Sequence, residues 1–354
     1  MNVLQRMLRR PFFIRLLHWE YWSFGMVYGW IYPVWVLLAL RARSFFFFAA
    51  SNPKIKNGGF LCESKKDIHE IMNVNLYPAT MHFAAGISPD HVIKKLNECG
   101  FTYPLIGKPD TGGRGRGVKL LENENECAAY VNNTEIDFHI QQFISYKYEI
   151  GIFYYRWPGQ IDGHISGIVR KEFLSITGDG KCTVRDLLMK DKRSLLQLES
   201  LQNIYGDYLD TILPAKEEKL MVPYGNHARG AMFLDDSHLA DEKLVAVVNG
   251  ICKDIDEFYF GRLDIKYDNW EDFKNAKKFS VIEVNGAGAE PTHIYDPRHS
   301  IIFAWKEIVR HWFILNKISR MNHKRGVKYL TVKEGLSMFR EDKEHSRKLK
   351  KMKE

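Results

Sequence analysis

The sequence predicts an α+β fold. Segments with helical periodicity and segments with strand-like alternation follow one another in a mixed order, without the regular strand-helix alternation of a parallel sheet. The length of 354 residues is sufficient for two or three domains. With 45% hydrophobic and 27% charged residues, the composition is that of a globular protein, which excludes wholesale disorder and collagen-like or coiled-coil architecture.

The N-terminal segment, residues 1–50, contains an uncharged stretch at residues 21–40 that is long enough for a membrane-spanning helix. Gly25, Gly29 and Pro33 interrupt this stretch, and aromatic residues run along it instead of gathering at its ends. Four arginines precede it and two follow, so a single span with the body in the cytoplasm would oppose the positive-inside tendency. A re-entrant or interfacial segment therefore fits better than a span.

Aromatic residues are concentrated in the same segment, which holds 14 of the 47 in the chain. Trp and Tyr favour a boundary between apolar and wet surroundings, so we expect residues 1–50 to attach to a membrane surface. Packing onto the body as core and a true span remain alternatives, whereas the apolar stretch is too long for a cleaved signal peptide. The expected location is cytoplasmic, at the inner face of the membrane.

The folded body begins after the breakers at residues 52–59. Ser64 is a candidate N-cap for a helix that ends before Tyr77-Pro78, and Ser88-Pro89 begins a second helix that stops at Gly100. Extended segments are expected at residues 103–109, 118–121, 139–145 and 148–156, with a helix at 124–131.

Four glycines, Gly112, Gly113, Gly115 and Gly117, lie in the loop that joins the first two of these strands. Glycines allow backbone amides to approach phosphate oxygens. Because a strand-like sequence follows, whereas a dinucleotide-binding loop leads into a helix, we expect a flap between antiparallel strands. Lys108, just before the loop, is placed as a phosphate clamp. The alternative is a flexible hairpin without a ligand.

Two later segments carry polar residues at strand spacing, Arg262-Leu-Asp264 and Glu283-Val-Asn285. Residues two apart in a strand share a face, so paired strands would bring three oxygen-bearing side chains together beside a guanidinium. Hard oxygen ligands of this kind suit magnesium. The alternative is a strand pair with one solvated polar face.

The Lys108-Pro-x-x-Gly-Gly-x-Gly-x-Gly-Val loop, with Gly261-Arg-x-Asp and then Glu283-Val-Asn, resembles the ATP-grasp superfamily, and within it the D-alanine:D-alanine ligase branch. The stretches 168–171 and 178–188 are similar to cyanophycin synthetase and related amino-acid ligases. The resemblance covers residues 52–297. It implies an ATP-grasp fold, in which two α+β subdomains grip the nucleotide.

The resemblance also implies roles for individual residues. Those that it assigns to ATP are Lys65 (with Lys66 as a rival), Lys108, Gly112, Gly113, Gly115, the adenine hinge Gln142, Phe143 and Ile144, and Glu149 at the ribose. It assigns Mg²⁺ to Asp264, Glu283 and Asn285, the transferred phosphoryl group to Arg170, the acyl-phosphate stage to Arg262, and a substrate loop to Asn226 and Arg229. Relatives often carry an acid where Gln142 stands, so the adenine contact is expected to differ. They also follow Glu-x-Asn with a short Pro or Ser turn, whereas this chain continues with Gly286-Ala-Gly-Ala, so acceptor recognition is expected to differ too.

The implied function is an ATP-dependent carboxylate-amine, or carboxylate-nucleophile, ligase that uses ATP and Mg²⁺ (Mn²⁺ as alternative) and forms an acyl phosphate. Its partners would be a small-molecule carboxylate and an amine or other nucleophile. Two other hypotheses stay open: a kinase of the same superfamily, and a non-catalytic nucleotide-binding peripheral membrane protein. The expected domains are an N-terminal segment (1–50), the first part of the body (51–102), a small subdomain (103–156), a C-terminal subdomain (157–305) and a basic helical tail (306–354).

The net charge of +8 belongs to the two ends of the chain, because the middle is mildly acidic. The Lys-rich tail 340–354 is expected to be a solvated helix or frayed terminus. No aromatic-basic platform supports nucleic-acid binding. The five scattered cysteines indicate a reducing compartment. The histidines His18, His69, His227, His293 and His311 show no metal-ligand spacing and are expected to pack or to lie at the surface. The oligomeric state has no sequence signal.

Overall fold

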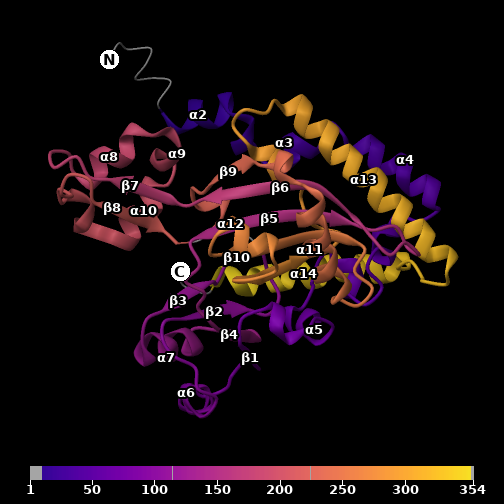
Figure 1. Cartoon of the computed structure of the whole chain (residues 1–354), viewed down its shortest axis with the longest axis horizontal. Coiled ribbons are helices and arrows are strands. Elements are labelled where there is room, and N and C mark those ends of the chain that lie inside the picture. The colour runs from indigo at the N-terminus through magenta and orange to yellow at the C-terminus, as the bar shows by residue number, and fades with distance from the viewer. Residues whose placement is uncertain (1–9, 114, 224, 352–354) are drawn as a thin grey trace.

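The computed structural model describes residues 10–113, 115–223 and 225–351, and helices and strands are mixed in it as the sequence predicts (Figure 1). The strands form three antiparallel sheets, with strand orders β1-β4-β2-β3, β11-β10-β5-β6-β9 and β7-β8. The first two sheets position the candidate site. The predicted α+β class is confirmed.

The small sheet lies in the lower part of Figure 1 and contains β1 (Thr80–Phe83), β2 (Leu105–Pro109), β3 (Lys119–Leu121) and β4 (Phe138–Gln142). Helices α6 (Pro89–Glu98) and α7 (Glu124–Asn132) bury their apolar residues against one face of it. Ser88 caps α6 as predicted, because its hydroxyl accepts from the His91 amide. β2 and β3 pair antiparallel, which confirms the predicted hairpin around the Gly-rich loop.

The helix predicted from Ser64 also forms, as α5 (Lys65–Glu70), with the Ser64 hydroxyl accepting from the Asp67 amide. It is shorter than predicted, since a 3₁₀ turn, η4 (Val74–Leu76), occupies the residues before Tyr77.

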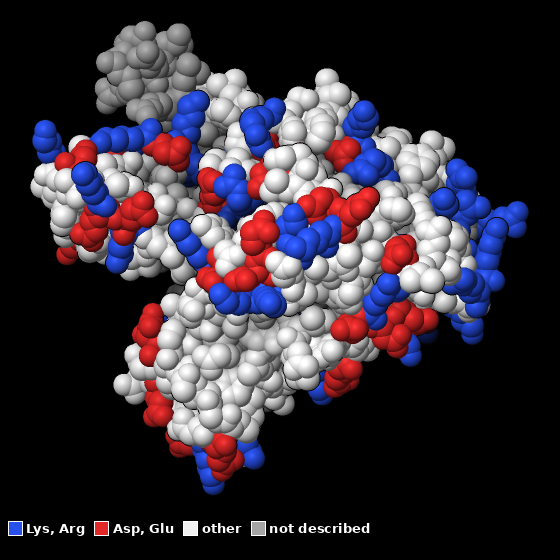
Figure 2. All heavy atoms as spheres, in the orientation of Figure 1, with Lys and Arg blue, Asp and Glu red and all other residues white. Residues whose placement is uncertain are grey.

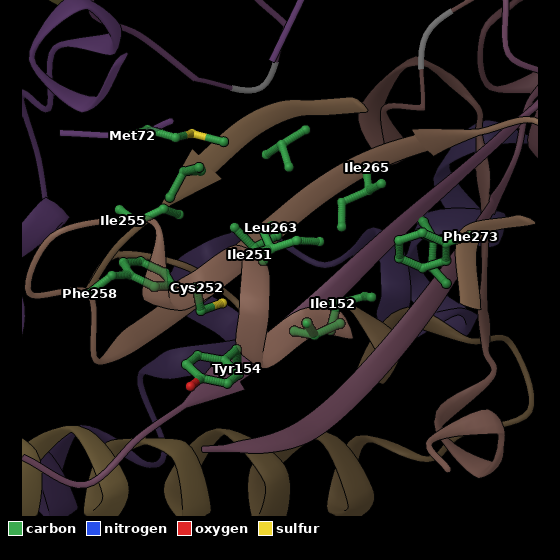
Figure 3. Packing of buried hydrophobic residues seen from close by; sticks show 14 of the residues in the cluster. Met72, Ile152, Tyr154, Ile251, Cys252, Ile255, Phe258, Leu263, Ile265 and Phe273 are labelled. Carbon is green, nitrogen blue, oxygen red and sulfur yellow. The ribbon is translucent and has the colours of Figure 1, made fainter. Parts of the chain in front are cut away.

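The central sheet contains β5 (Tyr148–Tyr155), β6 (His164–Glu172), β9 (Met232–Asp235), β10 (Phe260–Tyr267) and β11 (Phe279–Asn285). One face packs on α11 (Glu242–Lys253) and α12 (Trp270–Lys274) in an apolar core (Figure 3). Ile152, Leu263 and Ile265 from the sheet meet Ile251 and Cys252 from α11 there. The alternate residues of the same strands form the other face, which is partly polar.

A third unit projects at the left of Figure 1. It contains the pair β7 (Leu174–Thr177) and β8 (Glu218–Val222) with helices α8 (Val184–Lys190), α9 (Lys192–Leu195) and α10 (Leu198–Tyr205) and the 3₁₀ turn η5 (Gly206–Asp210). It has its own apolar cluster, centred on Leu188, Leu201 and Leu209.

Elements from the two ends of the chain form a layer that packs on the central sheet. This layer contains α2 (Pro11–Leu17), α3 (Phe24–Tyr28), α4 (Tyr32–Ala42), α13 (Ile301–Lys324) and α14 (Val332–Lys351), with η1 (Trp19–Tyr21), η2 (Phe47–Ala50), η3 (Lys56–Gly59) and η8 (Thr292–Tyr295). Trp35 and Phe47 pack with Ile318 of α13 and Phe153 of β5. Part of the N-terminal segment is therefore core.

Within the described ranges, no helix has the length and apolarity needed to cross a bilayer. The uncharged stretch 21–40 is divided between α3, which ends before Gly29, and α4, which begins at Tyr32, the neighbour of Pro33. Gly29 and Pro33 thus mark the interruption as expected, whereas Gly25 lies inside α3. Residues 1–9 of the segment lie outside the described part of the chain.

Candidate functional site

The polar strand pair predicted from the sequence forms in the structure. β10 and β11 pair antiparallel, with Arg262 opposite Asn285 and Asp264 opposite Glu283. Directly opposite residues of an antiparallel pair share a face, so all four side chains lie on one side of the central sheet. The predicted convergence of three oxygen-bearing side chains beside a guanidinium is confirmed.

Asp264 lies at the centre of this polar face and is almost fully buried, with 2% of its surface exposed. The Arg262 guanidinium donates to both of its oxygens, at 3.0 Å from Nε and 3.1 Å from Nη2. Lys171 Nζ lies 3.2 Å from Oδ1. Burial acts to raise the pKa of Asp264, but the charges of Arg262 and Lys171 outweigh it and hold the pKa below its usual value. Asp264 is therefore an ionised oxygen donor.

Lys171, which the sequence analysis did not select, is the basic residue of β6 on this face. It is buried between Asp264 and Glu149, and its Nζ donates to Glu149 Oε1 at 2.7 Å. Its neighbour Arg170 points to the opposite face, where it pairs with Asp236 (Nε to Oδ2, 2.7 Å) and Glu172. The expected position of Arg170, facing the transferred phosphoryl group, therefore needs correction, because the alternation of β6 places Lys171 beside Asp264 and Arg170 away from it.

Lys108 connects the small sheet to the central sheet. Its Nζ donates to Gln141 Oε1 at 2.9 Å and to the carbonyl of Ile282 at 3.3 Å. Ile282 stands in a β-bulge, because the residues on either side of it pair with consecutive residues of β10. Burial, together with the nearby charge of Lys65, lowers the pKa of Lys108 to about 7. The lysine thus lies beside Glu283 with its charge poised to change near neutrality.

Lys65 lies at the start of the glycine loop, where its Nζ donates to the carbonyls of Asp110 (3.3 Å) and Gly112 (3.2 Å). The Lys66 side chain instead lies beside Glu70 at the exposed surface of α5. Of the two rival lysines, Lys65 is the one directed at the loop.

Glu63 is a further acidic residue that the sequence analysis missed. Burial raises the pKa of this carboxyl to about 7, with a further contribution from Glu283 and an opposing one from Lys65. Its Oε2 accepts from the Gly286 amide at 3.4 Å. The only sequence signal was its place in the Glu-Ser-Lys tripeptide, which was used for Lys65 alone.

The residues of the predicted adenine hinge contact two different parts of the molecule. The Gln142 amide bonds the backbone of Thr102, donating to its carbonyl at 2.8 Å and accepting from its amide at 3.3 Å. Phe143 and Ile144 lie beside Lys266, whose Nζ is 5.0 Å from the Phe143 ring centre and donates to the Ile144 carbonyl at 3.1 Å. The Gln142 side chain is therefore turned toward Thr102, while the next two residues adjoin the central sheet.

The predicted substrate loop covers the polar face. A Cβ added to Gly225 would lie 2.5 Å from Glu149 Oε1, so the backbone of this loop passes directly over the carboxylate. Asn226 meets the glycine loop, because a Cβ on Gly115 would lie 3.1 Å from its Nδ2. Arg229 ends the short turn η6 (His227–Arg229) that follows.

The C-terminal helix α14 packs against the glycine loop from the other side. His345 Nε2 lies 2.6 Å from the Thr111 carbonyl, and a Cβ on Gly112 would lie 3.1 Å from Leu349. No atom lies within 4 Å of a Cβ added to Gly113, which borders open space. The Lys-rich tail, expected over 340–354 as a solvated helix or frayed terminus, is helical to Lys351 and mostly exposed, but it is docked at Leu349, which is buried.

A pocket between the two sheets brings Lys65 and Lys108 together with Glu283, and Ile68, His69 and Tyr77 also line it. Its volume is about 10 Å³, the room of a single water molecule. Of the predicted residues, Lys65, Lys108 and Glu283 line this pocket, whereas Arg170 lies on the far face of the sheet.

No protein-family model and no curated protein sequence matches this chain. Among solved structures, it is similar to D-alanine--D-alanine ligase from Bacillus anthracis, at 14% identity over 74% of this chain and 69% of that one, with a TM-score of 0.41. It is also similar to the D-Ala:D-Ser ligase from Enterococcus faecalis (14% identity, 76% and 64%, TM-score 0.40). A third is the bifunctional glutathione synthetase from Pasteurella multocida (14%, 72% and 38%, TM-score 0.36).

These neighbours are ATP-grasp enzymes, the superfamily that the sequence motifs resemble. The chain spans 38% of the glutathione synthetase and 64% of the D-Ala:D-Ser ligase. TM-scores of this size carry no argument about activity, for which the residues of the chain itself must account.

Proposed function

We propose that the protein is an ATP-dependent ligase that joins a carboxylate to an amine or another nucleophile through an acyl phosphate. The observation that carries this proposal is the contact between the small sheet and the central sheet. There Lys108 donates to the carbonyl of Ile282, next to the paired acids Asp264 and Glu283. A cation from one sheet and acids from the other are the arrangement that phosphoryl transfer between ATP and an acidic substrate requires.

The donor set of Asp264, Glu283 and Asn285 fits Mg²⁺, which prefers oxygen ligands. Asp264 and Glu283 stand directly opposite one another on this face, Arg262 and Lys171 hold the pKa of Asp264 below its usual value against the effect of burial, and Asn285 would contribute its Oδ1. When bound, Mg²⁺ (or Mn²⁺) neutralises phosphate charge and fixes the reacting phosphate. The ion would be held by these three residues, with the Arg262–Asp264 contact orienting the carboxylate.

In the proposed reaction, a substrate carboxylate oxygen attacks the γ-phosphorus of ATP, and the bond to the ADP oxygen breaks. The amine then attacks the acyl carbon, phosphate leaves, and the amine loses a proton. Lys65 and Lys108 would bind the phosphates, and Arg262 would stabilise the negative charge of the acyl phosphate stage. Lys171, rather than Arg170, is placed to support this face through Asp264 and Glu149.

Glycines 112, 113 and 115 would let backbone amides approach the phosphates, and Glu149 would bind the ribose once released from the cover of the loop at Gly225. Phe143 and Ile144 would flank adenine with Gln142 contributing backbone groups, since its side chain is engaged with Thr102. Asn226 and Arg229 would face the acceptor. The pocket itself, about 10 Å³, is far too small for a phosphate, so a phosphate bound between Lys108 and Glu283 would need the small sheet to move away from β11.

The test is a screen of small carboxylates with hydroxylamine as a universal amine, measuring ADP, inorganic phosphate and hydroxamate. A ligase forms the hydroxamate in equal amounts with ADP and phosphate. A kinase, the second hypothesis, releases ADP while phosphate stays on the substrate. Binding of ATP with no ADP release for any acceptor would favour the third hypothesis, a nucleotide-binding protein without catalysis.

We propose further that the N-terminal segment lies on a membrane, at its inner face with the body in the cytoplasm. Among the described residues, 11 of the 23 large hydrophobic side chains that are exposed belong to residues 12–45. Trp30, in the turn between α3 and α4, is 77% exposed. Leu40 and Leu37 of α4 are 69% and 65% exposed, whereas Trp35 and Leu38 of the same helix are core. Such a surface, with aromatic and aliphatic side chains outward, fits the interface of a bilayer.

Exposed basic residues border this apolar surface, namely Arg10, Arg15, Arg41 and Arg43. Positive side chains also gather at the right-hand end of the molecule, over the end of α13 (Figure 2). Anionic lipid headgroups would complement both. Flotation with anionic vesicles should show binding that Trp30→Ser with Leu37→Ser weakens, whereas Ile161→Ser, exposed elsewhere, leaves it unchanged. Equal flotation of all three proteins would contradict the proposal.

A further inference from the structure

Three strands of the small sheet place a second cluster of potential metal ligands side by side. His82 of β1 stands directly opposite His139 of β4, and Lys108 of β2 stands opposite His139 on its other side. Asp110 follows two residues after Lys108, and its amide bonds the Asp137 carbonyl, which continues the pairing of β2 with β4. Residues at these positions share the face of the sheet that α5 covers.

The three side chains lie close enough to hold one ion. The His82 and His139 ring centres are 4.3 Å apart and the ring planes are perpendicular. His139 Nε2 lies 3.0 Å from Asp110 Oδ1, and one ligand atom from each residue falls within 4.8 Å of the others. His139 is fully buried. Ligand atoms 2.0–2.2 Å from a zinc ion stand roughly 3.5 Å apart, so small side-chain rotations would complete the geometry.

The hydrogen bonds among the described residues leave ring nitrogens of these imidazoles without a partner. His82 Nδ1, His139 Nδ1 and the Nδ1 of neighbouring His69 are buried without a partner. A buried polar atom left without a partner destabilises the fold, so three in one place point to a group that these contacts do not include. The His69 ring lies 5.4 Å from that of His82 and stacks on Tyr77.

We propose that His82, His139 and Asp110 bind a divalent transition metal, Zn²⁺ in the first place. Two imidazoles and a carboxylate are zinc ligands, in contrast to the all-oxygen set at Asp264 and Glu283. A water or His69 would take the fourth position. The nearest cation in the pairing register, Lys108, directs its ammonium to Gln141 and Ile282.

The role of this site is to hold the phosphate-binding end of the small sheet. Asp110 Oδ1 also accepts from the Ser64 hydroxyl (3.0 Å) and the Lys66 amide (2.9 Å), so the metal would fix the start of α5 to the sheet. Lys65, between those two residues, bonds the carbonyls of Asp110 and Gly112. The metal is thus structural and takes no part in a chemical step.

The experiment uses the full-length protein, stripped with a chelator and titrated with Co²⁺ in millimolar Mg²⁺, which occupies sites made of oxygen ligands. We expect one equivalent of Co²⁺ to give the visible bands of a low-coordinate nitrogen-oxygen site, and Zn²⁺ to remove them. His82→Gln, on the edge strand and half-buried, should lose the bands, as should Asp110→Asn. His91→Gln, exposed on α6, is the matched control and should keep them.

A second measurement keeps the test independent of folding. Zn²⁺ should raise the melting temperature of the stripped wild type and of His91→Gln, but not that of His82→Gln, whose metal-free circular dichroism should match the wild type. Bands of equal intensity in wild type and His82→Gln, or no bands in the wild type, would overturn the proposal and leave a His-Asp hydrogen-bond network. Neither result bears on ligase activity, which is measured separately.

Discussion

Replacing Lys171 with methionine should harm the protein far more than the same replacement at its neighbour Arg170. The Lys171 side chain is 5% exposed and lies between those of Glu149 and Asp264, of which 6% and 3% of the side-chain surface is exposed. Without the lysine, Glu149 loses the ammonium that donates to it, and Asp264 keeps only Arg262. Removing one partner of a buried ion pair costs about 3–5 kcal/mol. The Arg170 side chain is 37% exposed, and the loss of its surface pairs should cost about 0–1 kcal/mol.

Urea unfolding followed by circular dichroism measures the loss of stability in each variant. Lys171→Arg, which keeps the charge, is the control. Hydroxamate formation from ATP measures the loss of activity. We expect it to fall about 100- to 1000-fold in Lys171→Met and little in Arg170→Met, as for loss of a charge beside a reacting phosphate. If Arg170→Met lost as much stability and activity as Lys171→Met, the assignment of the two faces of β6 would be wrong.

Three other predictions concern single groups. Glu283→Gln should abolish ATP turnover while leaving the thermal unfolding curve in place; near-normal turnover would count against its role as a metal ligand. ATP should bind the free protein more weakly as pH rises through about 7, where Lys108 loses its proton, and calorimetry should find this dependence flattened in Lys108→Arg, whose guanidinium stays charged. Glu20→Ala should destabilise the protein by about 3–5 kcal/mol, because it strands the buried Arg193 that Glu20 contacts at 2.8 Å. Burial acts to raise the pKa of Glu20, but the His227 and Arg193 contacts outweigh it and lower the pKa below its ordinary value of 4.5. The stability that Glu20 contributes should therefore be present above pH 4.5 and be lost as pH falls below it. The double variant Glu20→Leu with Arg193→Met should recover stability and remove this loss at low pH.

The parts of the site that the sequence predicted are those that local patterns determine. Arg262 and Asp264, like Glu283 and Asn285, stand two apart in strands, so their shared face follows from alternation alone. The caps at Ser64 and Ser88 and the hairpin around the glycine loop are equally local. Each was correct because neighbouring residues decide it.

The parts that were missed depend on which face of an element meets the rest of the molecule. Lys171 and Arg170 are adjacent cations, and only the packing of α11 on one side of the sheet distinguishes them. The cluster of His82, Asp110 and His139 joins positions far apart in sequence, so no spacing reveals it. The docking of the tail was missed because a highly charged helix needs only a few buried residues, such as Leu349, to dock.

The helix α14 connects two distant parts of the molecule. Gly335 lies against the Phe46 ring near one end and Leu349 beside Gly112 near the other, and these two residues are about 21 Å apart along the helix. A slide of the helix by a single residue would displace its far end by about 1.5 Å. A misplacement of that size is enough to slow a positioned reaction about a hundredfold. The layer that faces the proposed membrane and the loop that faces the proposed phosphates are therefore joined through one rigid helix, and a displacement of the first would be carried to the second.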